Sequence, residues 1–298
     1  MKKKLVLLIF AQALVFTGCG TDVPAVNEPR AATHEVTDDL GRKVVVPVNV
    51  RRVVSLAPNL TENIFAVGAG DRLVGVTTFC NYPEAAASIP KVGDTMNPSI
   101  ERIVAIKPDI VFVSTASQIE NFTRTLEQNG IAVYVTNPAS MDGVLKNLGQ
   151  LNDLLGVDAI ETIENLGRRI TVVRQAVAAA EKARVFVQIS KEPLFTVGKQ
   201  SFLNAIVDAA GGKSVTSDVE TAYPKLSKET ASALRPEVII LSESPDNQEP
   251  NEVFRNSPAV KNGRVYKINA DLLSRPGPRL IDALEQIARF LHPEKFPE

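Results

Sequence analysis

Short apolar runs alternate with helix-like stretches along most of the chain. Residues 52–56, 72–76 and 183–189 are rich in β-branched side chains, and each run has the length of a buried strand. The stretches that follow them are bounded by proline and glycine, as helices often are. Strands that alternate with helices predict α/β lobes with largely parallel sheets.

The N-terminal part of this pattern is specific enough to name individual elements. Residues 36–47 predict a hairpin that turns at residues 39–41. A helix is expected to open near Pro58, with Asn59 or Thr61 as its N-cap, and to end at the glycines of residues 68–70. Residues 77–98 carry no apolar period and predict a long loop, and loops of that length are usually functional or disordered.

One fourteen-residue pattern occurs twice. Residues 101–114 read ERIVAIKPDIVFVS and residues 229–242 read ETASALRPEVIILS. Each copy runs from a glutamate through a short helical stretch to a basic-Pro-acidic break, and then into an apolar strand that ends at serine. Their spacing is far longer than a solenoid repeat, which is roughly 20–50 residues. The repeat therefore predicts two lobes built alike, with a cleft between them.

A single helix is expected to join the two lobes. Residues 157–181 contain no proline, and their apolar residues recur every three or four positions. This pattern predicts one helix of about 25 residues, or roughly 38 Å. Because one long helix is stiffer than several crossing strands, we expect only a small opening and closing motion. The apolar positions are Ile160, Ile163, Leu166, Ile170, Val173 and Val177.

The N-terminus has the pattern of an export signal. Three lysines precede an apolar stretch that is too short to span a membrane, and the stretch ends at Cys19 in a sequence similar to a bacterial lipobox. An ordinary signal peptide cut nearby is the alternative. We therefore expect a signal peptide at residues 1–18, lipidation of Cys19, a tether at 19–34, an N-terminal α/β lobe at 35–156, a linking helix at 157–182 and a C-terminal α/β lobe at 183–298.

Composition narrows the function further. The chain of 298 residues has a net charge of −1, so no overall field favours nucleic acid or acidic lipid. Once Cys19 is set aside, Cys80 is the remaining cysteine, and it cannot form an intramolecular disulfide. We interpret Cys80 as a small, partly buried residue rather than a nucleophile.

Five short segments carry a resemblance to a known family. They are residues 52–62 (RVVSLAPNLTE), 81–84 (NYPE), 99–109 (SIERIVAIKPD), 195–199 (FTVGK) and 275–279 (RPGPR). In this order and spacing, residues 36–293 resemble the helix-linked (class III) substrate-binding proteins of ABC importers, and most closely those that bind cobalamin. The resemblance implies a non-enzymatic, monomeric receptor without a resident cofactor. It would be lipid-anchored outside the cytoplasmic membrane, hold a corrinoid between its lobes and deliver it to permease and ATPase subunits.

The same resemblance places the ligand at the carboxyl ends of the strands. Phe79 and Tyr223 would offer flat apolar area to a macrocycle, and Asn59, Asp271 and Arg275 would hydrogen-bond its periphery. The chain lacks the tryptophans that usually line the cleft of cobalamin-binding relatives, which leaves other corrinoids or chelates open. The expected wall residues are Pro58, Asn59, Phe79, Thr95, Ser114, Ile189, Tyr223, Asp271 and Arg275.

Glu101 and Glu229 open the two copies of the repeat. In the family that the chain resembles, one such glutamate on each lobe docks against arginines of the permease, which implies the same role here. The alternative is that each is an exposed acid near a helix start, favoured there by the helix dipole.

Other kinds of receptor are the alternatives to a corrinoid receptor. A direct metal receptor needs several converging ligands, but the two histidines, His34 and His292, lie near the ends of the folded part. A haem receptor could use Tyr82 or Tyr223 as axial ligand. A ferric-siderophore receptor, the runner-up, would need basic groups such as Arg275 and Lys191.

An enzyme is the alternative from another class. The GGKS sequence of residues 211–214 resembles the tail of a phosphate-binding loop, but Val207 stands where the first glycine belongs. The chain has no Gly-x-Ser-x-Gly elbow, and Cys80 has no obvious base nearby in the sequence.

Overall fold

The computed structural model describes residues 32–114 and 120–297. The predicted signal peptide, Cys19 and the tether up to residue 31 lie outside the described residues. The described chain begins with strands β1 (Thr33–Thr37) and β2 (Lys43–Pro47), which pair antiparallel as the expected hairpin. Asp38 fixes the turn, since its carboxylate accepts hydrogen bonds from the backbone N–H groups of Leu40 and Arg42. Strand β1 thus starts two residues before the predicted lobe boundary at residue 35.

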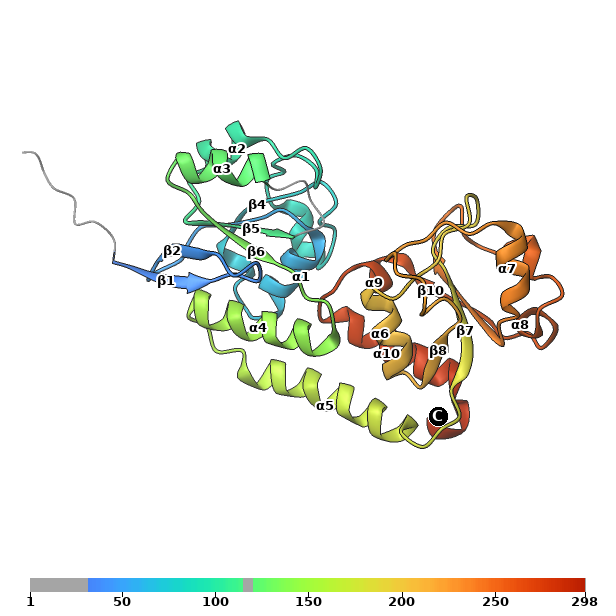
Figure 1. Cartoon of the computed structure of the whole chain (residues 1–298). Helices are drawn as coiled ribbons and strands as arrows, with labels where there is room; N and C mark the ends of the chain where they lie inside the picture. The colour runs from blue at the N-terminus through green and yellow to red at the C-terminus, as the bar shows by residue number, and fades with distance from the viewer. Residues whose placement is uncertain (1–31, 115–119, 298) are drawn as a thin grey trace, which may run out of the picture. The chain divides into compact units, whose positions relative to one another are not determined.

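Two parallel four-stranded sheets follow, one in each lobe (Figure 1). The first has the order β4-β3-β5-β6 and the second, read from its β8 edge, the order β8-β7-β9-β10. The two sheets therefore share one topology, as the repeat predicted. The strands are β3 (Val53–Ser55), β4 (Leu73–Val76), β5 (Ile110–Ser114), β6 (Ala132–Thr136), β7 (Ala183–Gln188), β8 (Gly212–Ser214), β9 (Val238–Glu243) and β10 (Val265–Asn269).

Helices cover both faces of each sheet, so the central strands are apolar on both sides. The α-helices are α1 (Pro58–Ala66), α2 (Ile100–Ala105), α3 (Glu120–Gln128), α4 (Met141–Leu155), α5 (Ile160–Val177), α6 (Phe202–Ala209), α7 (Lys228–Leu234), α8 (Pro258–Lys261), α9 (Ala270–Ser274) and α10 (Arg279–Leu291). Short 3₁₀ turns lie at Gly70–Arg72, Glu84–Ser88, Glu252–Phe254 and Pro293–Lys295. None of the helices among the described residues is long and apolar enough to cross a bilayer.

One hydrophobic core runs through both lobes. In the first sheet, Val53 and Phe112 belong to the same cluster as the buried faces of α1 and α4, and in the second sheet Val185 belongs to it together with α6 and α10. Helix α5 joins the two halves of this cluster through Leu166 and Ile170. The opposite sheet faces have cores of their own, with α2 and α3 in the N-terminal lobe and α7 and α8 in the C-terminal lobe.

Helix α5 is shorter than the sequence predicted. It has 18 residues, or about 27 Å, instead of about 25 residues. At its start, Gly156 ends α4 in the left-handed region and the Asn152 side chain accepts the Ala159 N–H, which holds the chain in a turn. After Val177, its last buried residue, the next residues are largely exposed. Helices depend mostly on tertiary packing, so the helix ends where that packing ends.

The expected N-cap of α1 was wrong. The cap residue is Ala57, which makes no side-chain cap, and Pro58 occupies the first turn. Proline is favoured there because its missing N–H would have no partner anyway. Asn59 and Thr61 lie inside the helix and are buried. The Thr61 hydroxyl bonds Ser55 of β3 instead, at 2.8 Å.

The sequence repeat is also a repeat in backbone geometry. Helices α2 and α7 are both capped by serine, with Ser99 accepting the N–H of Arg102 and Ser227 that of Thr230. Each helix is followed by a basic residue with left-handed backbone angles. Lys107 has φ 46° and Arg235 has φ 44°. This conformation is strained for residues other than glycine.

The turn after each helix is tied to the neighbouring strand in the same way. The carboxylate of Asp109 accepts the N–H of Arg52 just before β3, and Glu237 accepts the N–H of Arg184 at the start of β7. The side chains of these two arginines donate back to carbonyls at the carboxyl ends of α2 and α7. Each lobe therefore contains the same helix–turn–strand unit with the same contacts.

Candidate functional site

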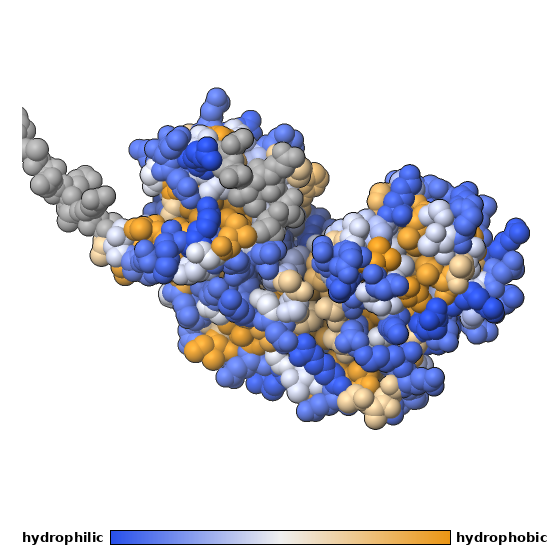
Figure 2. All heavy atoms as spheres, in the orientation of Figure 1, coloured by the Kyte–Doolittle hydropathy of each residue, from blue (hydrophilic) through white to orange (hydrophobic). Residues whose placement is uncertain are grey.

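A cavity of about 630 Å³ lies between the two lobes, at the carboxyl ends of their strands. Figure 2 shows the hollow between the lobes on this face. The cavity, called the ligand cleft below, has a volume in the range of small-molecule sites. Its described walls are Ala57, Pro58, Asn59, Phe79, Thr95, Ser114, Asn137, Pro138, Gln200, Ser201, Phe202, Ala222, Tyr223, Asp271, Ser274, Arg275 and Pro276.

Eight of the nine wall residues expected from the sequence line this cleft. They are Pro58, Asn59, Phe79, Thr95, Ser114, Tyr223, Asp271 and Arg275. Ile189 does not line it. Its backbone N–H donates to the Phe195 carbonyl, and its half-buried side chain packs against the core. The chain turns back on itself directly after β7, which carries Ile189 away from the cleft.

Several wall residues were missed by the sequence analysis. Asn137 and Pro138 follow β6 directly, and residues 200–202 open helix α6. An Asn-Pro pair after an apolar run is a usable signal for a strand end at a cleft, and Ser201 is recognisable as the N-cap of α6. The missed residues are mostly small, polar or amide-bearing.

Aromatic rings reach the cleft from both lobes. Phe79, from the loop after β4, is 57% exposed, and Tyr223, from the loop after β8, is 43% exposed. Rings left this open offer apolar area that a ligand can cover. Asn59 is buried at the same wall, and its Nδ2 group has no hydrogen-bond partner among the described residues.

The charged side chains among the described walls compensate each other. The Arg275 guanidinium lies 2.7 Å from Asp271 Oδ2. Its Nη1 donates to Oε1 of the buried Glu62 at 2.9 Å and to Asn81 Oδ1 at 2.8 Å. Arg275 is therefore almost fully engaged, whereas the Asp271 side chain is 37% exposed. Among the described wall residues, Arg275 is the one cationic side chain, and it is paired with the carboxylates of Glu62 and Asp271.

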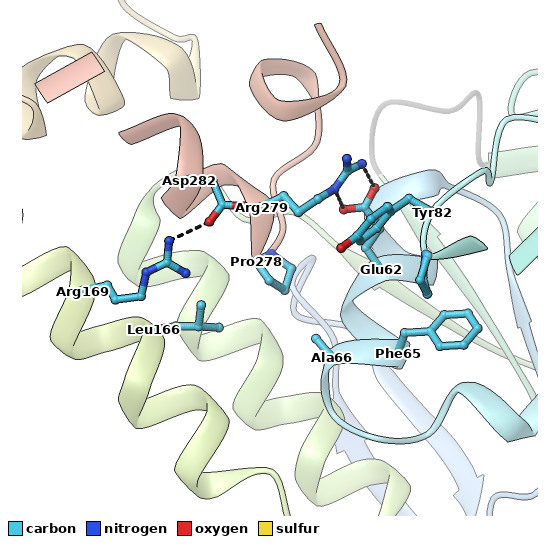
Figure 3. A pocket seen from close by; sticks show the side chains of 10 residues that line it. Glu62, Phe65, Ala66, Tyr82, Leu166, Arg169, Pro278, Arg279 and Asp282 are labelled. Atoms are coloured by element: carbon cyan, nitrogen blue, oxygen red, sulfur yellow. Dashed lines mark hydrogen bonds and ion pairs between the residues drawn. The ribbon is translucent and has the colours of Figure 1, made fainter. Parts of the chain in front are cut away.

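Glu62 also binds a second arginine, Arg279, which does not line the ligand cleft. Arg279 donates from Nε and Nη2 to the two oxygens of Glu62, at 2.8 and 2.6 Å, and its Cζ lies 3.9 Å from the centre of the Tyr82 ring (Figure 3). The bond to Glu62 raises the pKa of Arg279. Neither Glu62 nor Arg279 was recognised from the sequence.

These residues border a second cavity of about 390 Å³, called the back cavity below. Its walls come from α1, the Tyr82-Pro83 turn, α5 and the start of α10, and they are Glu62, Phe65, Ala66, Tyr82, Pro83, Leu166, Arg169, Pro278, Arg279 and Asp282 (Figure 3). Arg169 is held there by Glu285 and Asp282, and its pKa is raised mainly by the hydrogen bond to Glu285 and also by Asp282.

Glu101 and Glu229 are the second residues of α2 and α7, and both are exposed. The pKa of Glu229 lies below its usual value because the carboxylate accepts hydrogen bonds from its own backbone N–H and from the Ser227 hydroxyl. Glu229 is therefore ionised at neutral pH. The two glutamates thus present one anionic point on each lobe.

The other singled-out residues have structural partners. Cys80 is buried between the hydroxyls of Thr61 and Thr77. The buried His292 contacts the Gly211 carbonyl through Nε2, at 3.0 Å. Within residues 32–114 and 120–297, no three His, Cys, Asp or Glu side chains are placed to hold a metal ion.

Comparison with known proteins gives a consistent picture. Residues 53–272 match a family described as periplasmic binding protein. An uncharacterized ABC transporter substrate-binding lipoprotein, YvrC, of Bacillus subtilis is 28% identical, with 96% of each chain covered. A vitamin B12-binding protein of Vibrio vulnificus is 30% identical over 80% of this chain and 89% of its own.

A solved structure has the same fold. The crystal structure of the periplasmic vitamin B12-binding protein BtuF of Vibrio cholerae superposes with a TM-score of 0.74 and 29% identity, over 84% of this chain and all of that one.

Proposed function

Because the chain belongs to the periplasmic binding protein family, we propose that it captures a corrinoid in the ligand cleft and delivers it to the membrane subunits of an ABC importer. The protein is an extracytoplasmic substrate-binding protein of the class that includes receptors for vitamin B12, haem and siderophores. Proteins of this class bind solutes and are not enzymes. They work with permease and ATPase subunits.

The arrangement of Phe79 and Tyr223 is the observation that carries the corrinoid proposal. The two rings come from opposite lobes and are open at one cavity. A flat, largely apolar macrocycle can cover both at once, whereas a small hydrophilic ion cannot. The vitamin B12-binding names of two matched proteins support the same ligand class.

The polar groups of the cleft suit a ligand with neutral amide arms. The exposed part of Asp271 can accept from an amide N–H. Asn59 Nδ2 is buried and unpartnered at the same wall, so its side chain would have to rotate toward the cleft to donate to an amide carbonyl. Corrinoids carry several such arms around the ring. The contact to Asn59 would satisfy a donor that has no partner among the described residues.

A ferric siderophore or haem is the second candidate, and the charges disfavour it. Anionic siderophores and haem propionates need cations, but Arg275 is already bound by Glu62 and Asp271. Lys191 lies outside the cleft and faces Glu249 at 3.5 Å. Tyr82 borders the back cavity, which leaves Tyr223 as the wall residue available as an axial ligand to haem.

Titration calorimetry with the purified protein tests the ligand. We expect cobalamin or cobinamide to bind one to one, and Phe79→Ala and Tyr223→Ala each to weaken binding about tenfold through loss of ring contact. Tyr266→Ala is the matched control, because Tyr266 stacks on Phe290 outside the cleft. Flat titrations with both corrinoids, together with saturable binding of a ferric siderophore or haem, would reject the corrinoid and select the second candidate.

Glu101 and Glu229 are proposed as the points that dock on the permease, one on each lobe. Their equal position at the starts of α2 and α7 supports this role, since two separated anions can fix orientation on a two-fold partner. The signal peptide, the lipid anchor at Cys19, the monomeric state and the absence of a resident cofactor stay predictions.

A further inference from the structure

One buried carboxylate connects the two lobes. Glu62 belongs to α1 of the N-terminal lobe, and its side chain is 2% exposed. It binds Arg275 and Arg279, which flank the start of α10 and lie 213 and 217 residues further along the chain. Asn81 of the N-terminal lobe accepts from Arg275 as well. These four residues, with Asp271 and Tyr82, are called the latch below.

The backbone between the two arginines lies close against α1. This segment, residues 275–279, reads Arg-Pro-Gly-Pro-Arg. A Cβ atom on Gly277 would come within 2.9 Å of Asn63 Oδ1, so only glycine fits without a shift. The prolines limit the conformations of the segment. The arginines are therefore presented to Glu62 from a stiff, closely packed backbone.

The charges of the latch balance. Glu62 and Asp271 supply two negative charges, and Arg275 and Arg279 supply two positive ones. Side-chain exposure is 9% for Arg275 and 18% for Arg279. Ions buried to this degree are only weakly screened by salt, and loss of one partner leaves another without compensation. The latch therefore favours one arrangement of the lobes at physiological ionic strength.

The latch reaches the ligand cleft through two of its members. Asp271 and Arg275 line the cleft, whereas Glu62 and Arg279 line only the back cavity. Glu62 cannot act on a ligand in the cleft by direct contact. It can act by fixing Arg275, which in turn holds Asp271 at 2.7 Å.

We infer that Glu62 is a positioning residue for ligand capture: through Arg275 and Arg279 it holds the lobes, and the Asp271 wall, in the binding arrangement before the ligand arrives. The effect on affinity rests on the proposed function, but the effect on lobe arrangement does not. Apparent affinity falls in proportion to the fraction of molecules in the competent arrangement.

The test uses Glu62→Gln, which keeps the shape of the side chain and removes its charge. We expect corrinoid affinity to fall at least about tenfold, as it would if only a tenth of the molecules remained competent. Glu285→Gln is the matched control, because Glu285 also pairs with an arginine but joins α5 to α10 rather than one lobe to the other. This control should bind as the unaltered protein does.

A distance measurement separates positioning from a general loss of structure. Spin labels at Gln128→Cys in α3 and Ala233→Cys in α7, both exposed, report the separation of the lobes in a Cys19→Ser chain. Without ligand we expect one narrow distance distribution for the Glu285→Gln protein and a broader one for Glu62→Gln. Arg279→Gln keeps the Glu62–Arg275 pair, so it should broaden the distance distribution less than Glu62→Gln does. This variant replaces Glu62→Gln in the measurement if Glu62→Gln does not fold.

The outcomes are distinct. Unchanged affinity in Glu62→Gln, or a loss of affinity with an unchanged distance distribution, overturns the inference. If the unaltered protein binds no corrinoid, the proposed function fails, while the distance distributions still decide whether Glu62 holds the lobes.

Discussion

At the scale of single residues, Tyr134 shows how burial and charge combine. Its ring lies in the core of the N-terminal lobe, edge-on to Phe112, and its hydroxyl donates to the Thr37 carbonyl at 3.2 Å. Burial, reinforced by the negative charges of Asp39 and Asp38, raises the pKa of Tyr134 to about 12. The folded protein therefore disfavours the phenolate.

This shift predicts a loss of stability in alkali. The folded pKa lies above the unfolded value of about 10, so the free energy of unfolding is unaffected below pH 10 and falls between pH 10 and 12, by roughly 2–3 kcal/mol. Urea unfolding at pH 8, 10 and 11 measures the loss. Tyr134→Phe should cost about 1 kcal/mol at pH 8 through the lost hydrogen bond and should lack this part of the alkaline loss. Equal alkaline losses in both proteins would contradict the assignment.

The strand ends read from the sequence place some residues at the wall of the cleft. Pro58 follows and Ser114 ends a predicted strand, and parallel strands bring such positions to one edge of a sheet. Ile189 was placed by the same rule and was wrong, because the chain turns back directly after β7. Glu62 and Arg279 were missed because no local pattern reveals a pairing across 217 residues. Whether the wall residues contact a ligand stays a prediction.

At the scale of elements, the repeated helix–turn–strand unit was predicted in outline. The sequence marks the glutamate, the proline break and the strand in both copies. It does not reveal that Lys107 and Arg235 adopt left-handed backbone angles, since residues before proline usually favour extended ones.

Relief of this strain should be measurable. Lys107→Gly and Arg235→Gly remove the side chain that disfavours positive φ, at the cost of some unfolded-state entropy, so each should raise the free energy of unfolding by about 0.5 kcal/mol. Lys107→Ala keeps a Cβ atom and serves as control, with no expected gain. Thermal unfolding of the three variants and of the unaltered protein measures the change in stability. A loss of stability in both glycine variants would show that the turns are not strained.

At the scale of the whole molecule, the two lobes share one core through α5, while their outer sheet faces keep separate cores. Helix α5 is therefore part of both lobes rather than a free linker. The small lobe motion expected from the sequence stays a prediction. The length of α5 was overestimated because the prediction extended the helix to residues 157–181, beyond its apolar period, whose first and last positions, Ile160 and Val177, are the ends of the helix.

Docking on the permease is a property of the whole molecule and is tested as such. Replacing both Glu101 and Glu229 by Ala should leave corrinoid affinity intact and abolish uptake into cells, because both side chains are exposed and lie outside the ligand cleft. Glu164→Ala on α5, another exposed acid, is the matched control and should support normal uptake. Weakened corrinoid binding in the double variant would mean that the glutamates belong to ligand capture instead.

The paired caps and turns of α2 and α7 have an evolutionary consequence. The proposed docking on two equal permease subunits would require both copies of the surface to stay alike, so that a change in one lobe alone would be selected against. A ligand without internal symmetry does not require the walls of the cleft to be alike in the two lobes, and the two lobes carry different residues at these walls. New cargo can therefore be acquired by substitutions at the strand ends while the fit to an existing importer is retained.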